Sequence, residues 1–160
     1  MSKLKVFCFG FGQVAEFFIN KLIQEKKDFD LSITSRQETH QIEINNLKVS
    51  SFQFSHDKFD SSIKKQLEEA NYILISIPPI EGRDIVANYL DKNLINIKNC
   101  KWITYLSATS VYGDHKGEWV NENSITKPTS SNGLSRLAAE NTWRELSIKN
   151  KYPLQIFRLA

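Results

Sequence analysis

The chain has 160 residues, of which 41% are hydrophobic and 24% charged, and its formal net charge is +3. This size and composition suit one globular domain with a packed core. Basic residues are spread along the chain, apolar runs are far shorter than the ~20 residues of a membrane span, and the first residues lack a secretory signal pattern. We therefore expect a cytoplasmic protein that binds neither nucleic acid nor membranes.

Strand-like apolar runs alternate with segments of helical periodicity along the chain. Strands are predicted over 5–9, 31–34, 47–54, 71–77, 101–106 and 154–159, and helices over 14–23, 61–69, 84–94 and 134–147. Ser61 or Ser62 can cap the second helix, and Pro78-Pro79 stops the fourth strand. Strands that alternate with helices pair in parallel through right-handed crossovers. The sequence thus predicts one α/β domain over 1–160: a Rossmann-type doubly wound parallel sheet of about six strands, with helices on both faces.

A glycine-rich turn follows the first strand and opens the first helix. It reads Gly10-Phe11-Gly12-Gln13-Val14-Ala15, the G-x-G-x-x-A pattern in its proper strand–turn–helix context. Gly10 permits the tight turn, Gly12 lets a pyrophosphate approach the backbone, and Ala15 keeps helix and strand close. The free N–H groups of Gln13 and Val14 at the helix start then face the anion. The pattern predicts a dinucleotide-binding site.

The end of the second strand distinguishes the two nicotinamide cofactors. NAD-specific sites usually place an Asp or Glu there, which binds the ribose hydroxyls and repels a 2′-phosphate. This chain has Ser35-Arg36 instead, and an arginine can pair with a phosphate. The pair favours NADP over NAD. The alternative is that Arg36 is a solvated loop residue, which the nearby Glu38 allows.

The remaining strand ends supply further candidate cofactor ligands. In doubly wound sheets, ligands bind beyond the carboxyl ends of the strands. Those ends carry Ser76-Ile77-Pro78 after the fourth strand and the segment that begins at Ser107 after the fifth. Cys8 and Cys100 show no partner spacing and the histidines are scattered, so we expect no disulfide and no metal site.

Segment 105–114, Tyr-Leu-Ser-Ala-Thr-Ser-Val-Tyr-Gly-Asp, resembles the fifth strand of the extended short-chain dehydrogenases/reductases, the NAD(P)-dependent epimerase/dehydratase group. Val120-Asn121-Glu122, Pro128 and segment 154–160 match the same family in order. The short glycine turn and Ser76-Ile77-Pro78-Pro79 are more similar to its atypical branch. The resemblance implies an NAD(P)-binding oxidoreductase or epimerase-like protein that acts on a small molecule, such as a sugar nucleotide.

The family's catalytic positions are all changed. Its chemistry uses a Ser or Thr that orients the substrate, a Tyr that acts as acid and base, and a Lys that lowers the Tyr pKa and binds ribose. By the family's spacing these positions are Ala108, Asn132 and Arg136. Asn132 cannot exchange a proton at physiological pH, whereas Arg136 can still bind ribose or phosphate oxygens. If the register shifts by one, the substitute for the missing hydroxyl is Thr109, Ser107 or Ser110.

Two hypotheses therefore stand side by side. One is an enzyme of the atypical branch with a rearranged acid and base, for which Tyr112 and His115 are further candidates. The other is a catalytically inactive dinucleotide-binding sensor or interaction module. Family members continue beyond the sixth strand with a substrate-binding part, so we expect a truncated or split nucleotide-binding half. The helices over 84–94 and 134–147 correspond to those that pair subunits in the family, which suggests a homodimer.

Overall fold

A seven-stranded sheet runs through the computed structural model, which describes residues 3–160. The strand order is β3-β4-β2-β1-β5-β6-β7, and every neighbouring pair is parallel except β3 with β4. The strands are β1 (Leu4–Phe9), β2 (Phe29–Ser35), β3 (His40–Ile44), β4 (Leu47–Gln53), β5 (Tyr72–Ile75), β6 (Trp102–Ala108) and β7 (Leu154–Leu159). Without β3, this is the order of a doubly wound dinucleotide-binding sheet. The predicted fold class is confirmed.

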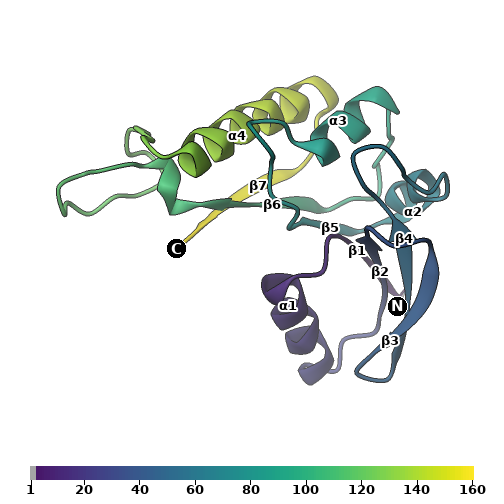
Figure 1. Ribbon diagram of the computed structural model, residues 1–160. Coiled ribbons are helices and arrows are strands. Elements are labelled where there is room, and N and C mark those ends of the chain that lie inside the picture. Colours follow the sequence, from purple (N-terminus) through teal and green to yellow (C-terminus); the bar gives the residue numbers. More distant parts are fainter. Residues whose placement is uncertain (1–2) are drawn as a thin grey trace.

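Helices cover both faces of the sheet. They are α1 (Gln13–Gln24), α2 (Ile63–Glu69), α3 (Ile85–Lys92) and α4 (Ser131–Asn150), with a short 3-10 helix, η1 (Thr109–Val111), after β6. Figure 1 shows α1 on one side of the sheet and the other three on the opposite side. Alternation along β1 places Val6 and Cys8 in the core under α1, and Phe7 and Phe9 in the larger core under α2–α4. Burial on both faces explains the solid apolar run of this strand.

The topology places a crevice beside β1. Strand β1 pairs with β2 on one side and with β5 on the other. The connections to the strands before and after β5 therefore lead toward opposite edges of the sheet, and the strand order reverses beside β1. In such sheets the carboxyl ends of the strands on either side of the switch point border the ligand site. The ends of β1, β2, β5 and β6 therefore form the edge to examine.

The sheet has one strand more than predicted. Residues 40–44 form β3, which pairs antiparallel with β4 through a two-residue turn at Asn45-Asn46. Both asparagines have positive φ, +48° and +64°, as tight hairpin turns require. The strand escaped prediction because only Ile42 and Ile44 are apolar in it, and neither is fully buried at this sheet edge.

The boundaries of α2 and α4 also differ from the prediction. Ser62 occupies the N-cap position of α2 but its side chain caps nothing; its hydroxyl and its backbone N–H both donate to Asp60. The predicted serine cap is therefore wrong. Helix α4 is longer than 134–147, because the Ser130 hydroxyl accepts from Gly133 N–H at 3.1 Å and Lys151 ends the helix in a left-handed conformation.

Candidate dinucleotide site

The glycine turn connects β1 to α1 as the sequence predicts. Gly10 has a φ of +79°, and its N–H donates to Thr34 Oγ1 at 2.9 Å. A Cβ at Gly10 would lie 2.9 Å from Ser76 Oγ and 3.0 Å from the Ile77 side chain. Conformation and contact both require glycine here. Ala15 is fully buried where α1 crosses the sheet.

The start of α1 is open toward the crevice. The first intrahelical bond joins Glu16 N–H to Gly12 O at 3.0 Å, and no side chain caps the helix. The N–H groups of Gln13, Val14 and Ala15 are therefore not used within the helix. A Cβ at Gly12 would meet no atom within 4 Å, so the backbone just before these donors is open to a ligand. The geometry fits a pyrophosphate group bound against the backbone.

The end of β2 presents a cation to solvent. Ser35 is the last residue of β2, and its Oγ accepts from Ser51 at 3.2 Å. Arg36 is exposed and makes no ion pair or side-chain hydrogen bond with any residue in 3–160. It lines an open depression of about 610 Å³ together with Gln37, Glu38, Thr39, His40 and Gln53. Glu38 does not neutralise Arg36 in this arrangement.

The end of β5 lies directly against the glycine turn. Strand β5 stops at Ile75, two residues earlier than predicted, but the backbone N–H and the hydroxyl of Ser76 both donate to Phe9 O at 3.0 Å. Ile77 is half-buried and Pro78 is exposed. Farther along this loop, Gly82 N–H donates to Ser135 Oγ on α4 at 2.8 Å. The β5 loop is thus fixed to both β1 and α4.

The three residues that the resemblance predicts at catalytic positions lie near the end of β6. Ala108 is the last residue of β6, and exposed Thr109 begins η1. Asn132 Nδ2, in the first turn of α4, donates to Ser110 Oγ at 3.3 Å. Arg136 Nη1, one turn later, donates to Leu106 O at 2.7 Å. All three residues thus lie in one region, and their role stays a prediction; neither the methyl group of Ala108 nor the amide of Asn132 can exchange a proton.

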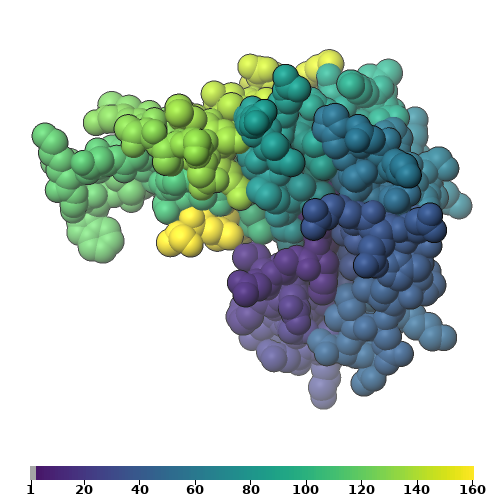
Figure 2. Space-filling view, in the orientation of Figure 1, coloured from purple at the N-terminus to yellow at the C-terminus, as the bar shows by residue number. Residues whose placement is uncertain are grey.

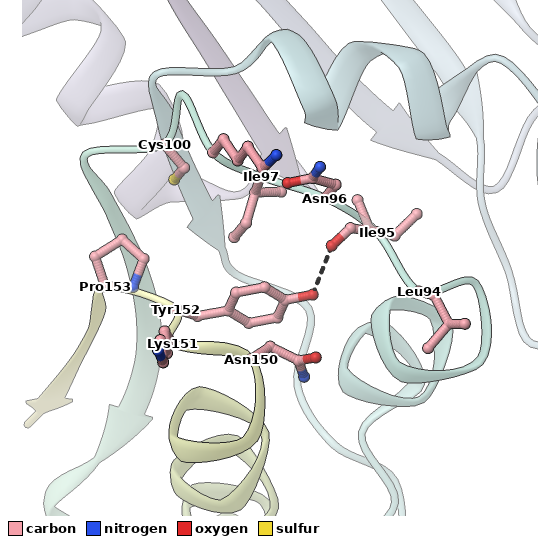
Figure 3. Close-up of a pocket in the computed structure, with 10 residues that line it drawn as sticks. Leu94, Ile95, Asn96, Ile97, Cys100, Asn150, Lys151, Tyr152 and Pro153 are labelled. Atoms are coloured by element: carbon pink, nitrogen blue, oxygen red, sulfur yellow. Dashed lines mark hydrogen bonds between the residues drawn. The ribbon is translucent and has the colours of Figure 1, made fainter.

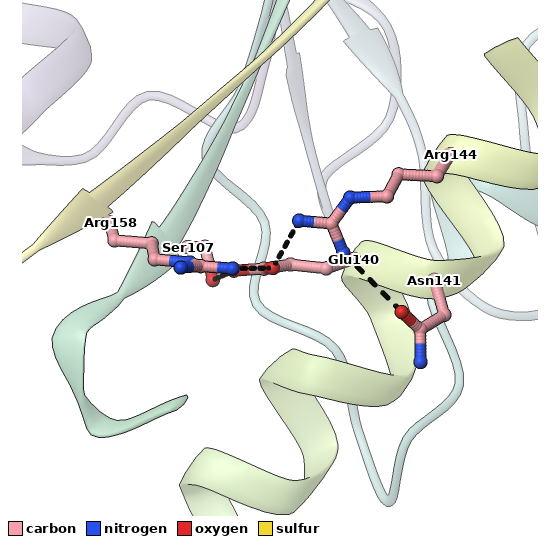
Figure 4. Close-up of polar contacts among 5 residues, drawn as sticks. All are labelled: Ser107, Glu140, Asn141, Arg144 and Arg158. Carbon is pink, nitrogen blue, oxygen red and sulfur yellow. Dashed lines mark hydrogen bonds and ion pairs between the residues drawn. The ribbon is translucent and has the colours of Figure 1, made fainter. Parts of the chain in front are cut away.

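Ser107 is directed away from the glycine turn, to the α4 face of the sheet. It is buried, and its hydroxyl donates to Glu140 Oε1 at 2.7 Å. Glu140 is fully buried and also accepts from Arg158 Nε at 2.9 Å, Arg158 Nη2 at 2.8 Å and Arg144 Nη2 at 3.0 Å (Figure 4). Burial by itself would raise the pKa of Glu140, but Arg158, Ser107 and Arg144 together lower it. We call Ser107, Glu140, Arg144 and Arg158 the Glu140 cluster.

The loop between η1 and α4 extends away from the body of the molecule beside the end of β7 (Figure 2). Tyr112, at its base, is buried, and the Arg158 guanidinium lies 4.7 Å from its ring centre. His115 lies within the loop, with Nε2 at 3.0 Å from Ile125 O. Tyr112 thus packs against Arg158 of the Glu140 cluster, while His115 contacts the backbone of its own loop.

The opposite edge of the sheet carries a separate pocket. It has a volume of about 520 Å³ and lies between the α3–β6 connection and the turn that precedes β7 (Figure 3). Tyr152 Oη donates to Ile95 O at 2.8 Å within it. The predicted cofactor ligands lie at the carboxyl edge, away from this pocket. Among residues 3–160, no three His, Cys, Asp or Glu side chains gather as metal ligands would, and no helix has the length and apolarity that crossing a membrane requires.

Solved structures share the fold of this chain over nearly its whole length. A functionally unknown conserved protein from Silicibacter pomeroyi is 26% identical, with a TM-score of 0.75, over 98% of this chain and 53% of that one. UDP-glucuronic acid 4-epimerase from Bacillus cereus, in complex with NAD, is 15% identical, with a TM-score of 0.74, over 97% of this chain and 56% of that one. UDP-N-acetylglucosamine 4-epimerase from Bacillus cereus is 18% identical, with a TM-score of 0.71, over 98% and 53%.

The chain thus spans about half the length of the solved structures that it matches. No family model and no curated protein matches the sequence. The resemblance to the epimerase/dehydratase group is confirmed at the level of the fold: the chain folds like about half of each of these epimerases.

Proposed function

We propose that the chain binds a nicotinamide dinucleotide across the carboxyl ends of β1, β2, β5 and β6, as the nucleotide-binding half of an oxidoreductase- or epimerase-like enzyme for a small molecule such as a sugar nucleotide. The open position at Gly12, in front of the unused N–H groups of α1, carries this proposal. Solved structures with the same fold hold NAD. A bound nicotinamide would supply hydride transfer.

Fluorescence titration of the purified chain with NADPH and NADH tests the proposal. Binding of either dinucleotide, with saturation at one molecule per chain, supports it. Failure to bind both at millimolar concentrations would show that the glycine turn is structural in this protein.

We further propose that the cofactor is NADP, with Arg36 as the ligand of its 2′-phosphate. Arg36 is exposed at the end of β2 and has no carboxylate partner in residues 3–160, so its guanidinium is available to a phosphate. Arg36→Ala should weaken NADPH binding about tenfold, the worth of one charge-assisted hydrogen bond, and leave NADH binding unchanged. Lys48→Ala removes the same charge at the amino end of β4 and is the matched control. Equal losses for both dinucleotides, or none, would refute the role of Arg36.

Arg136 is the proposed ligand of the ribose that carries the nicotinamide. Its Nη1 is held by Leu106 O, which fixes the guanidinium at the end of β6, and its other N–H groups can donate to ribose hydroxyls. A guanidinium is a hydrogen-bond donor and no acceptor, so Arg136 can orient the sugar but cannot act as a general base.

The second candidate function is an inactive dinucleotide-binding sensor or interaction module. Ala108 and Asn132, which cannot perform the family's acid–base step, favour it. A panel of carbonyl compounds and sugar nucleotides, assayed for NAD(P)H turnover, separates the two. We expect any turnover to survive Asn132→Ala within about twofold, because an amide moves no proton. A larger loss would place Asn132 in the reaction, and firm cofactor binding without any turnover would favour the sensor.

A homodimer through α3 and α4 stays a prediction. Sedimentation of the purified chain across a range of concentrations tests it.

A further inference from the structure

The strand that the sequence did not predict brings a histidine to the proposed cofactor edge. Strand β3 runs antiparallel to β4, so its first residue, His40, lies near the carboxyl end of β4, and residues 36–39 connect it to the end of β2. His40 and Arg36 line the same open depression of about 610 Å³. The topology therefore places an imidazole and a guanidinium around one depression at the carboxyl edge of the sheet.

The His40 ring is oriented by the backbone of its own loop. Its Nδ1 lies 2.6 Å from Glu38 O. A carbonyl oxygen only accepts, so Nδ1 carries the hydrogen of this bond. Nε2 makes no hydrogen bond to any residue in 3–160. In the neutral ring Nε2 is thus an acceptor, and it becomes a donor only when the ring takes up a second proton.

Thr39 holds this loop in place. Its hydroxyl donates to Asp60 and accepts from Gln53 N–H at 3.0 Å, which joins the loop to β4 and to the segment that precedes α2. Hydrogen bonds from Ser62 and Thr39 lower the pKa of Asp60, so this carboxylate stays ionised and occupied. The depression is therefore built on a loop that is fixed at its centre.

The depression has one positive charge fewer than a phosphate monoester needs. Its charged residues besides His40 are Arg36 and Glu38, and neither forms an ion pair within residues 3–160. Strand β4 adds only the neutral amide of Gln53, and Asp60 is held by Thr39. A phosphate monoester has a second pKa of about 6, so above pH ~7 it carries nearly two negative charges. Arg36 balances one of them, which leaves a place for a second cation.

We propose that His40 is a second ligand of the 2′-phosphate of NADPH: its ring takes up one proton from solvent, and Nε2–H then donates to a phosphate oxygen while Nδ1–H stays bonded to Glu38 O. The inference rests on the proposed dinucleotide site with Arg36 at the 2′-phosphate. Binding of NADPH is then coupled to proton uptake, so its affinity falls as the pH rises through and above neutrality. NADH has no 2′-phosphate and binds without this uptake.

Isothermal titration calorimetry in two buffers of different ionisation enthalpy counts the protons taken up on binding. At about pH 7.5, where a histidine is largely neutral, we expect roughly 0.5–1 proton per NADPH and none per NADH. His40→Ala should abolish the uptake, weaken NADPH binding about tenfold near pH 7 and leave NADH binding unchanged, because one charge-assisted hydrogen bond is lost. In wild type this advantage should disappear by about pH 9, where the imidazole stays neutral.

Two further variants separate this role from a structural one. His40→Gln keeps an N–H donor but does not titrate, so it should abolish the proton uptake and retain part of the affinity for NADPH. His56→Ala is the matched control, because His56 is also exposed but is bonded to Asp57 outside the depression. It should change neither the uptake nor the affinity. Melting temperatures show whether each variant is folded.

The outcomes distinguish the inference from the proposed function. NADPH binding without proton uptake, or uptake that persists in His40→Ala and His40→Gln, would show that His40 is not a phosphate ligand and would leave the dinucleotide site standing. Equal losses of NADH and NADPH affinity in His40→Ala would have the same meaning. If the wild-type chain binds neither dinucleotide, the proposed function fails, and the inference fails with it.

Discussion

Gly12→Val is expected to abolish dinucleotide binding without lowering the stability of the chain. A Cβ at this position meets no protein atom within 4 Å, so the valine side chain fits the fold and takes up space that the proposed pyrophosphate needs. The φ of Gly12 is −92°, which any residue adopts, so the folded backbone is not strained. We expect the affinity for NADPH to fall at least about 100-fold, or about 2.8 kcal/mol, with an unchanged melting temperature.

Gly10→Ala provides the contrasting variant in the same turn. Its φ of +79° and the 2.9 Å approach to Ser76 Oγ predict a loss of stability of about 1–2 kcal/mol from the backbone alone. Titration and thermal melting of both variants separate a ligand effect from a folding effect. Retained NADPH affinity in Gly12→Val would mean that the phosphates do not approach the start of α1.

Removal of the Glu140 carboxylate is expected to be among the most destabilising changes in the chain. Glu140→Ala leaves Arg158, itself only 12% exposed, without its two-point partner, and leaves the buried Ser107 hydroxyl without its acceptor. Loss of one member of a buried ion pair typically costs about 3–5 kcal/mol. For a chain of this size that corresponds to a fall in melting temperature of roughly 10 °C.

Asp91→Asn is the matched control for the Glu140 cluster. Its carboxylate pairs with Lys149 at 2.7 Å, but both side chains are largely exposed, so we expect a loss below about 1 kcal/mol. The double variant Glu140→Leu with Arg158→Met should lose less folding stability than the two single variants together, because it leaves neither of these two charges buried without its partner. Equal costs for Glu140→Ala and Asp91→Asn would show that the cluster does not stabilise the fold.

The Glu140 cluster should make the stability of the fold sensitive to acid. The pKa of Glu140 is lower in the folded state than its ordinary value, so its stabilising contribution is fully present above the unfolded-state pKa of about 4.3. The contribution is lost as the pH falls from there through the folded-state pKa. Melting temperatures measured from neutral pH downward should therefore converge for the wild-type chain and Glu140→Gln in acid.

The family spacing placed the candidate site in one region, but not the partners of its residues. Ala108, Asn132 and Arg136 lie near the end of β6, and their assignment to the family's catalytic positions stays a prediction. Ser107 was predicted beside the cofactor, yet its hydroxyl is bonded to Glu140. Alternation along β6 could have shown that Ser107 and Tyr105 share a face, but not which residues of α4 would cover them. Sequence reasoning missed Tyr105 and Glu140 because each owes its surroundings to a distant segment.

The sequence by itself determined the strand and helix order, the doubly wound sheet and the glycine turn, because these follow from local periodicity and from backbone freedom at Gly10. Only the tertiary structure decided the third strand, the burial of Glu140 between two arginines, and the packing of Tyr105 against Trp143. These contacts join residues from separate elements, and the direction of each side chain depends on how those elements pack. A charged residue is normally expected at the surface, but it can be buried where the packing of other elements supplies its partners.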